Sequence, residues 1–327
     1  MDKILTVVIP VYNMEKYLDN CLQSFIFDKE EKGLELLVVN DGSKDNSLKI
    51  ANEYAKKYPD IFKVIDKENG GHGSTINAGL KVATGKYFKV VDSDDWVDTD
   101  NFAKMFNDLK DLSTDCVICN GTTIVDGTNK RYPILSVKMQ FNQDLQISQA
   151  KKDIFYMSST TFLTKKIKDT TLTEKCFYVD AEYNSFTLSQ CKDYICLPYN
   201  VYMYRIGRPG QSVSDEGFYK HRDNHLTIVK SLINNYYAGN KSYLTLEKCK
   251  WIVKWHYFNY IRIFYKDKNL INELKDFDAY LKKYDELYKS SNKYFRIRTL
   301  RRHNFKNIKI FLFIKKIKQT IKKIIRA

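Results

Sequence analysis

The chain has 327 residues, 43% of them hydrophobic, so it is long enough to bury a full catalytic domain and a smaller additional part. Its seven cysteines are an odd number without the paired spacing of a disulfide or zinc framework, and the apolar run near the N-terminus predicts a strand rather than a secretory signal. We therefore expect a cytoplasmic protein. The net charge of +15 lies mostly at the C-terminal end, which indicates one basic segment rather than a basic molecule.

Strands and helices alternate along the first hundred residues. The continuous apolar run at 4–13 predicts a strand buried on both faces. The elements predicted after it are a helix at 15–27, a strand at 34–41, a helix at 47–58, a short strand at 62–65, a glycine-rich loop at 68–80 that leads into a helical turn, and a strand at 86–91. Alternation with short connections is typical of a mostly parallel, doubly wound sheet.

Polar side chains follow three of the predicted strands. Tyr12 and Asn13 end the first strand, Asn40 and Asp41 end the second, and the run 92–95 ends the fourth. Open α/β sheets bind ligands just beyond the carboxyl ends of their strands. The sequence therefore predicts a site at this edge of the sheet.

The run DSDD places the carboxylates of Asp92, Asp94 and Asp95 within four residues, where they repel one another. A hard divalent cation such as Mn²⁺ or Mg²⁺ removes that repulsion and keeps coordination positions for substrate phosphates. The run also fits a solvated turn that caps the helix predicted to begin near Thr99, and this motif alone does not separate the two interpretations.

Two common phosphate-binding motifs are absent from the sequence. The first strand is followed by no glycine, so the dinucleotide fingerprint fails there, and Ile76 stands where a later match needs its third glycine. A P-loop ending at Gly85 and Lys86 fails because Leu80 and Tyr87 occupy its other required positions. A nucleotide in this chain would therefore be held by carboxylates and a metal.

Four segments together resemble a known family. They are VVIPVYN at 7–13, VVNDGSKDNS at 38–47, NGGHGSTINAGLKVATG at 69–85 and VDSDD at 91–95. In this order and spacing they are similar to the large inverting nucleotide-sugar glycosyltransferase family (family 2 type) with the GT-A fold, over roughly residues 3–215. Each segment alone is an ordinary turn or loop.

The resemblance implies roles for individual residues of the donor site. Pro10 and Tyr12 would flank the nucleobase, Asp41 would accept a hydrogen bond from a uracil ring, and Asp92 and Asp94 would serve the ribose and a metal-bound diphosphate. The donor-binding set is Pro10, Tyr12, Asp41, Asn77, Asp92, Ser93 and Arg205, and the metal ligands are Asp94 and Asp92. Relatives often carry an arginine where this chain has Ile76, so the cation for the diphosphate must come from elsewhere.

An inverting transfer also needs a carboxylate that removes the proton of the acceptor hydroxyl. The segment CFYVDAEYNSF at 176–186 resembles the family segment in which an acid at a helix start is this base, which implies Asp180. Val179 replaces an acid that is frequent in relatives. Capping of the helix by Asp180 is the competing interpretation, and Glu182 is the second candidate for the base.

The segment 203–214 supplies candidate cations. Its sequence MYRIGRPGQSVS predicts a glycine- and proline-containing loop, at a place where family members close the donor site. Arg205 is assigned to the donor, and Arg208 is an alternative source of the positive charge missing at Ile76. A surface loop with two incidental arginines fits the same sequence.

The chain divides into four predicted parts. They are a nucleotide-sugar-binding half at 1–110, an acceptor-binding half at 111–216, a helical appendage at 217–292 and a basic amphipathic tail at 293–327. The tail contains thirteen Lys and Arg and no acidic residue, while the rest of the chain is nearly neutral. Its isoleucines recur at three- and four-residue steps, which is typical of helices that lie on anionic membranes.

These features predict a metal-dependent inverting glycosyltransferase at the inner face of the cell membrane. It would move a sugar from a nucleotide diphosphate, UDP being expected, to a hydroxyl of a growing surface glycan, which would be lipid-linked in one version of this hypothesis. A nucleotidyltransferase and a non-catalytic glycan-binding module on the same fold are the alternatives. The isoleucine stripe disfavours nucleic acid as a partner of the tail, whereas packing on the protein or on a second subunit in a homo-oligomer stays open.

Overall fold

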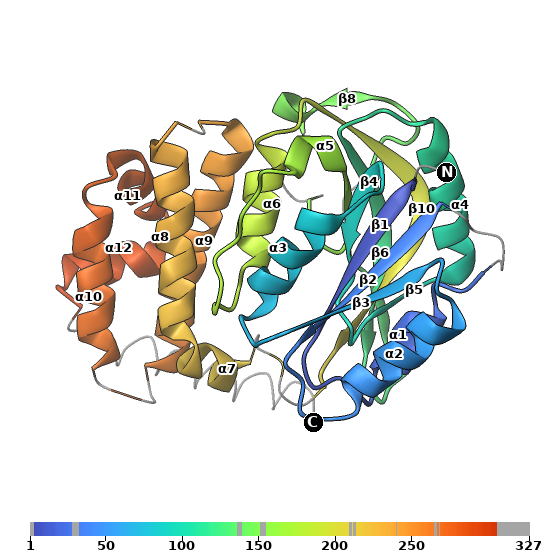
Figure 1. Ribbon diagram of the computed structural model, residues 1–327. Coiled ribbons are helices and arrows are strands. Elements are labelled where there is room, and N and C mark those ends of the chain that lie inside the picture. Colours follow the sequence, from blue (N-terminus) through green and yellow to red (C-terminus); the bar gives the residue numbers. More distant parts are fainter. Residues whose placement is uncertain are drawn as a thin grey trace.

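The computed structural model describes residues 3–27, 33–135, 139–150, 155–208, 211, 214–239, 241–264, 267 and 269–305. Within them, an α/β part with one twisted sheet lies beside a helical part (Figure 1). The predicted α/β fold with a helical appendage is therefore confirmed.

The first half of the sheet consists of parallel strands in the order β3-β2-β1-β4. The elements of this half are β1 (Leu5–Val11), α1 (Leu18–Gln23), β2 (Leu34–Asp41), α2 (Ser47–Lys57), β3 (Phe62–Lys67), α3 (His72–Val82) and β4 (Tyr87–Val90). Strand β1 is buried along its whole length, as its unbroken apolar run predicts. Because these strands are parallel, their carboxyl ends lie at one edge of the sheet.

The second half continues the sheet in the order β9-β6-β10-β5. Its elements are β5 (Trp96–Val97), α4 (Thr99–Asp111), β6 (Cys116–Val125), β7 (Arg131–Pro133), β8 (Leu145–Gln146), the 3₁₀ turn Ile147–Gln149, β9 (Thr160–Leu163), α5 (Thr164–Ile167), α6 (Asp180–Leu188) and β10 (Asp193–Ile206). Strand β9 is antiparallel to both β4 and β6, whereas β10 runs parallel to β6. Strand β9 thus joins two groups of parallel strands.

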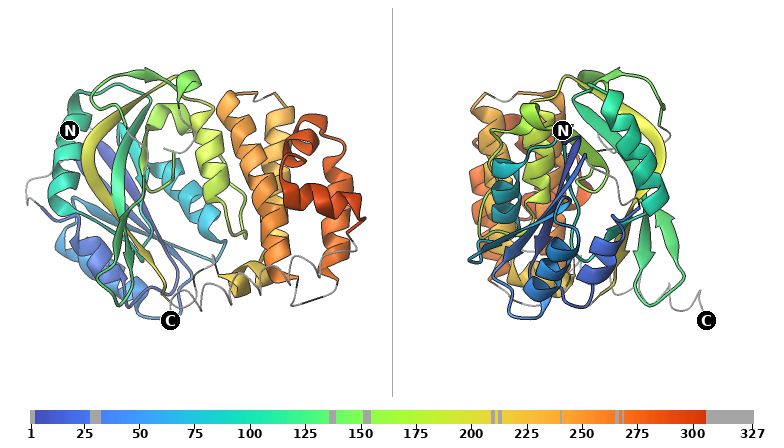
Figure 2. Two further views of the ribbon diagram at one scale, coloured as in Figure 1. Left: turned by 180° about the vertical axis from the view of Figure 1, so that it is seen from behind. Right: turned by 45° about the vertical axis from the view of Figure 1, so that its right-hand side comes forward.

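Helices cover both faces of the sheet (Figures 1 and 2). Helices α1, α2 and α4 pack on the face that receives Leu5, Val7 and Ile9 of β1. Helices α3 and α6 pack on the opposite face, which receives Val8. This alternation follows from the two-residue period of a strand, and it leaves α3 and α6 between the sheet and the helical part.

The helical part has a core of its own. It contains α7 (Asp215–Lys220), α8 (Arg222–Tyr237), α9 (Tyr243–Ile263), α10 (Leu270–Leu281), α11 (Asp285–Ser291) and α12 (Phe295–Arg302). Ile297 and Leu300 of α12 are buried in that core, and Arg301 Nε donates to Asp278 Oδ1 at 2.7 Å. The remainder of the predicted tail, 306–327, lies outside the described residues. Among the residues that are described, no helix combines the length and hydrophobicity needed to cross a bilayer.

The glycine-rich segment differs from the prediction. We expected a loop at 68–80, but helix α3 already begins at His72. A Cβ atom at Gly73 would lie 2.3 Å from the carbonyl oxygen of Thr173, and one at Gly79 would lie 2.4 Å from the side chain of Val8. These glycines therefore allow close packing of a helix, and this contact overrides the low helix propensity of glycine.

Candidate functional site

The loops that follow β1 and β2 are joined by hydrogen bonds. The backbone N–H of Asn13 donates to Ser43 Oγ at 3.1 Å, and the N–H of Lys44 donates to Asn13 Oδ1 at 2.8 Å. Asn13 adopts a φ of 54°, which asparagine tolerates better than most residues. This arrangement leaves Tyr12 exposed, while Pro10 is buried within β1. An open aromatic ring therefore lies at the end of the first strand.

Asp41 is buried at the end of β2 and connects it to the start of α3. Its Oδ1 accepts from the N–H of Gly70 at 2.8 Å and from Lys67 Nζ at 2.9 Å. Its Oδ2 accepts from the N–H of Gly71 at 2.8 Å. Because each carboxylate oxygen accepts about two hydrogen bonds, Oδ2 keeps capacity for one further donor.

Asp92 follows β4 and contacts the first residue of α3. Its Oδ1 lies 2.7 Å from His72 Nε2, and its backbone N–H donates to the hydroxyl of Tyr202 at 3.2 Å. Burial lowers the pKa of His72, but the charge of Asp92 and its hydrogen bond outweigh burial and raise this pKa. The histidine was not among the predicted site residues, and its place in the glycine-rich motif was the only signal for it.

Asp94 is mostly buried and forms an ion pair with Arg208 Nε. Burial and the neighbouring charge of Asp92 raise the pKa of Asp94, although Arg208 opposes this shift. Across the described ranges, no cluster of three or more His, Cys, Asp or Glu side chains is arranged to hold a metal ion. The two carboxylates nevertheless fit a hard cation that takes its other ligands from a bound diphosphate, because a cation relieves their mutual repulsion.

Arg205 is used within the protein. Its Nε donates to the carbonyl oxygen of Asp94 at 3.0 Å, and its Nη1 donates to Asp126 Oδ1 at 2.9 Å. The guanidinium also lies 4.7 Å from the ring centroid of Trp96. Ser93 is buried between the two acids. Of the two candidate arginines, Arg208 is the one whose guanidinium contacts the carboxylate of Asp94.

The third acid of the run, Asp95, has a different environment. It is 1% exposed and accepts from the hydroxyl of Tyr202 and from the backbone N–H of Arg205, both at 2.7 Å. Burial, followed by the charges of Asp94 and Asp92, raises its pKa well above the ordinary value. Asp95 therefore holds β10 against the acidic turn, and the sequence run alone did not distinguish it from its neighbours.

Asn77 connects α3 to the loop before α6. Its Nδ2 donates to the carbonyl oxygen of Leu172 at 3.0 Å, and its Oδ1 accepts from the N–H of Leu172 at 2.9 Å. A second bond from Nδ2 reaches Glu174 at 3.2 Å. These bonds give the amide a positioning role for the loop, whereas the sequence led us to expect a contact with the donor.

Asp180 is the first residue of α6 and is exposed. Protein surrounds it closely enough that desolvation raises the pKa of its carboxyl group, opposed by the positive charges of Lys248 and His72, while Asp92 adds to the increase. The N-cap position belongs to Val179. Asp180, His72 and Asp92 thus act on one another electrostatically, which relates the acidic turn to the start of α6.

Glu182, the second candidate for the base, is completely buried. Its Oε2 accepts from the N–H of Thr173 at 2.9 Å, and its Oε1 accepts from Thr173 Oγ1 at 2.8 Å. Both oxygens therefore hold the loop before α6, and the carboxylate is not open to a substrate.

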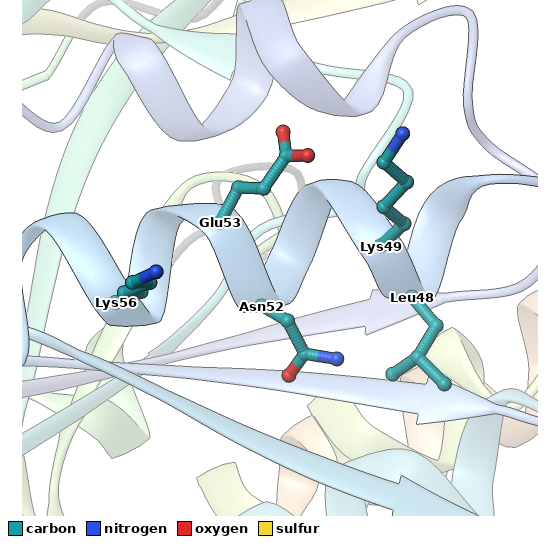
Figure 3. A pocket seen from close by; sticks show the side chains of 5 residues that line it. All are labelled: Leu48, Lys49, Asn52, Glu53 and Lys56. Atoms are coloured by element: carbon teal, nitrogen blue, oxygen red, sulfur yellow. The ribbon is translucent and has the colours of Figure 1, made fainter.

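Two surface hollows differ in their relation to these residues. One, of about 470 Å³, follows the outer face of α2 and is lined by Leu48, Lys49, Asn52, Glu53 and Lys56 (Figure 3). It contains none of the predicted site residues, and long flexible side chains form it. The other, of about 340 Å³, is lined by Arg205 and by 124–129 of the β6–β7 hairpin, and it adjoins the acidic turn.

The doubly wound, mostly parallel sheet with a cluster of acids at its carboxyl edge has the arrangement of the GT-A fold. Residues 6–171 match the sequence profile of the family described as Glycosyl transferase family 2. The chain therefore belongs to this family.

Similar proteins are found in Bacillus species. The chain is 40% identical over 126 residues to "Putative glycosyltransferase EpsH" of Bacillus subtilis, covering 38% of this chain and 36% of that protein. It is 29% identical over 238 residues to "Minor teichoic acid biosynthesis protein GgaB" of B. subtilis, covering 70% of this chain and 26% of that protein. A "Poly(ribitol-phosphate) beta-glucosyltransferase" of Bacillus spizizenii is 28% identical over 239 residues, covering 69% of this chain and 37% of that protein. The chain thus matches only 26% to 37% of the length of these relatives.

Solved structures support the fold. The structure of S. aureus TarS 1-349 in complex with UDP-GlcNAc superposes with a TM-score of 0.58 at 20% sequence identity, covering 88% of this chain and 81% of that one. Another crystal structure of S. aureus TarS 1-349 gives the same TM-score of 0.58 at 21% sequence identity.

Proposed function

We propose that this chain is a metal-dependent inverting glycosyltransferase that moves a sugar from a UDP-sugar to a hydroxyl of a growing surface glycan. The single observation that carries the proposal is the electrostatic grouping of Asp92, His72 and Asp180. It relates the end of β4, which would bind the donor, to the start of α6, which would bind the acceptor. The relatives from teichoic acid pathways support the glycan acceptor, and the TarS complex supports UDP as the donor nucleotide.

The nucleobase would lie at the ends of β1 and β2. The exposed ring of Tyr12 offers a stacking surface, and Asp41 Oδ2 can accept a hydrogen bond from a ring N–H. Lys67 and the N–H groups of Gly70 and Gly71 fix the carboxylate of Asp41. The rigid anchoring of Asp41 is what a selective contact with one base requires.

The diphosphate would lie beside the acidic turn. Asp94 and Asp92 would hold Mn²⁺ or Mg²⁺, which when bound stabilises the charge that develops on the leaving diphosphate. His72 and Arg208 add positive charge next to the same carboxylates. Arg208 therefore takes the role of the cation missing at Ile76, and Arg205 positions the turn through Asp126 and the carbonyl of Asp94.

Asp180 would act as the general base. It is exposed, whereas both oxygens of Glu182 are engaged with Thr173. The raised pKa makes the carboxylate of Asp180 a stronger base than that of an ordinary aspartate. The acceptor hydroxyl would give its proton to this carboxylate as it attacks the anomeric carbon from the face opposite to the leaving diphosphate.

A peripheral position at the inner face of the membrane is part of the proposal. It rests on the basic amphipathic pattern of residues 306–327, with a lipid-linked acceptor as its functional reason. A homo-oligomer formed through the same segment is the alternative use of that pattern.

The substitution Asp180→Asn tests the proposed chemistry. It removes the proton acceptor and keeps the size of the side chain, so transfer should fall by about 10² to 10⁴, as is usual for loss of a general base. Stabilisation by UDP and Mn²⁺ should persist, because Asp180 contributes nothing to the proposed nucleotide contacts. Transfer is measured as release of UDP from UDP-GlcNAc and other UDP-sugars in the presence of a glycan acceptor.

Glu182→Gln provides the comparison. It is expected to lower the melting temperature, because the bonds to Thr173 are weakened, with a smaller loss of transfer per folded molecule. Normal transfer by the Asp180→Asn enzyme together with an inactive, folded Glu182→Gln enzyme would assign the base to Glu182 instead.

A further inference from the structure

Helix α9 carries two exposed tryptophans on one face. Trp251 is 40% exposed and Trp255 is 37% exposed, and their ring centroids are 5.9 Å apart. They are four residues apart, so they lie one turn apart on the same side of the helix. The large apolar residues on the opposite side of α9, such as Val253 and Tyr257, are buried in the helical core. The tryptophans therefore contribute to a surface rather than to that core.

Helix α9 lies close to α6, and Leu244, one turn before Lys248 on α9, belongs to the same buried cluster as Tyr183 and Leu188 of α6. Tyr178, two residues before Asp180, packs its ring against Phe218 at 6.4 Å, and Phe218 packs against Tyr260 of α9 at 5.9 Å. Tyr178 also contacts His225, which stacks on His256 of α9 at 5.2 Å. Helices α6 and α9 are thus held together by aromatic packing, and the figures show them side by side (Figures 1 and 2).

Positive charges accompany the tryptophans. Lys248 Nζ lies 4.9 Å from the ring centroid of Trp251, and Lys254 Nζ lies 5.8 Å from that of Trp255. Lys248 is one turn before Trp251 on the same face, and its charge also acts on Asp180. Lys248 therefore connects the two parts of this surface, because it interacts with the ring of Trp251 and with the candidate base Asp180.

We propose that Trp251, Trp255 and Lys248 form a binding surface for the acceptor glycan, and that the glycan carries anionic groups. The flat rings of tryptophan stack on the apolar faces of sugar rings, and the adjacent lysines attract carboxylate or phosphate groups. This proposal rests on the proposed function, because the surface can position an acceptor for transfer only if Asp180 takes the proton of the acceptor hydroxyl.

A membrane is the competing occupant, because tryptophan and lysine are also frequent at lipid interfaces. The glycan is favoured because Lys248 lies beside Trp251 and its charge acts on Asp180, which the acceptor must reach. The tryptophans are moreover only partly exposed, so they project less than an inserted anchor would.

The test measures binding of the full chain to polysaccharides by electrophoresis in native gels. The gels contain hyaluronan, whose charge is carboxylate, poly(ribitol phosphate), whose charge is phosphate, or neutral dextran. We expect retardation by at least one of the anionic polymers and little by dextran, and the two anionic arms identify the charged group. The double variant Trp251→Ala/Trp255→Ala should bind at least tenfold more weakly. Tyr243→Ala, which removes another exposed aromatic ring of α9, should bind like the unmodified chain.

Thermal stabilisation by UDP with Mn²⁺ separates this inference from the proposed function. The double variant should keep that stabilisation, which also shows that it is folded. If the unmodified chain is stabilised by UDP but neither anionic polymer retards it, or the double variant is retarded equally, the acceptor surface is wrong. Loss of binding to phosphatidylglycerol vesicles, without loss of polysaccharide binding, would assign the face to the membrane and overturn the proposal. Absence of UDP stabilisation in the unmodified chain would instead contradict the proposed function.

Discussion

Individual acids of the run DSDD differ in what surrounds them. Asp94 is paired with Arg208, Asp92 with His72, and Asp95 is enclosed by Tyr202 and the backbone of β10. A cation that binds Asp94 must compete with Arg208, because both are attracted by the same carboxylate. Release of Arg208 towards the diphosphate would accompany metal binding, which couples the two charges in the proposed donor site.

The variant Asp94→Asn should lose the metal-dependent part of donor stabilisation. A ligand at 100 times its dissociation constant stabilises the native state by about 2.7 kcal/mol, so the unmodified chain should show a rise of several degrees in melting temperature with UDP and Mn²⁺. In Asp94→Asn the rise should be the same with and without Mn²⁺. Asp276→Asn, an exposed acid of α10, is the control and should behave like the unmodified chain. An unchanged Mn²⁺ effect in Asp94→Asn would exclude Asp94 as a ligand.

The pKa of Asp180 predicts the acidic limb of the pH–activity profile. Desolvation raises this pKa above the ordinary value of 3.8, so the carboxylate becomes protonated at a higher pH than in an ordinary aspartate. The proposed mechanism requires the ionised form of Asp180, so transfer should decline as the pH falls through this raised pKa. Lys248→Gln removes a charge that opposes the increase, so it should move the limb to still higher pH. The pH profile of kcat/KM for UDP-GlcNAc with a glycan acceptor measures the position of this limb. If the limb does not move in Lys248→Gln, the electrostatic coupling of Lys248 to Asp180 is contradicted.

At the scale of elements, helix α3 shows how packing decides conformation. Its glycines allow approach to β1 and to the loop before α6, and Asn77 then fixes that loop by hydrogen bonds. The N-terminus of α3 places His72 beside Asp92. One close-packed helix thus organises both the acidic turn and the segment that leads to Asp180.

Replacement of Gly79 by alanine should destabilise the fold, although alanine is the better helix former. The added Cβ would lie 2.4 Å from Val8, and overpacking of a core typically costs about 1 to 3 kcal/mol, more than the gain in propensity of roughly 1 kcal/mol. The control Lys81→Ala on the exposed side of α3 should leave stability within about 0.5 kcal/mol. Urea unfolding measures both, and a stabilised Gly79→Ala variant would show that α3 is less closely packed than described.

The buried histidines of α8 and α9 should make stability depend on pH. His225 Nδ1 lies 3.0 Å from His256 Nδ1, and burial lowers the pKa of His225 to about 4 and the pKa of His256 well below its ordinary value. The unfolded chain takes up protons near 6.5 while the native chain does not, so stability should fall as the pH decreases from about 6.5 towards 4. Each unit of pKa difference corresponds to about 1.4 kcal/mol.

The double variant His225→Gln/His256→Gln should flatten that dependence, whatever its absolute stability. His303→Asn removes an exposed histidine and should leave the profile nearly unchanged. Melting temperatures from pH 7 to pH 4.5 provide the measurement, and an equally steep decline in the double variant would assign the effect to other groups.

At the scale of the whole molecule, the α/β part and the helical part are joined around α6. Tyr178 and Phe218 link the start of α6 to α7, α8 and α9. Helix α12 belongs to the helical core through Ile297 and Leu300, and Arg301 completes it by pairing with Asp278. A truncation that spares this core must therefore remove only residues beyond 305.

Removal of 306–327 should reduce binding to anionic vesicles without affecting donor hydrolysis. The deleted segment contains eight Lys and Arg and no acid, and each basic residue near an anionic surface contributes on the order of 1 kcal/mol. Binding of the intact chain to phosphatidylglycerol vesicles should weaken as salt is raised. Vesicle binding that survives the deletion, together with a change of oligomeric state, would make the segment an assembly element instead.

The sequence by itself determined the fold class, the family and the edge of the sheet that carries the site. Apolar runs and the motifs at their ends are local, and parallel strands necessarily bring those ends together. Asp41, Asp92 and Asp94 were selected in this way, whereas Asp180 was selected from the resemblance of the segment 176–186 to a family segment. The antiparallel insertion of β9 was not predicted, because pairing between distant strands leaves little trace in a short stretch of sequence.

Only the tertiary structure decided what each of these side chains faces. Asp95 is enclosed by Tyr202, more than a hundred residues away, while Asp94 meets Arg208. Glu182 is buried against Thr173, while Asp180 is exposed one half-turn earlier on the same helix. Neighbours in sequence thus differ in desolvation and in hydrogen-bond partners, and these depend on contacts that form only when the chain has folded. The chemistry available to a carboxylate follows from them, because burial and partners set its pKa and its access to substrate.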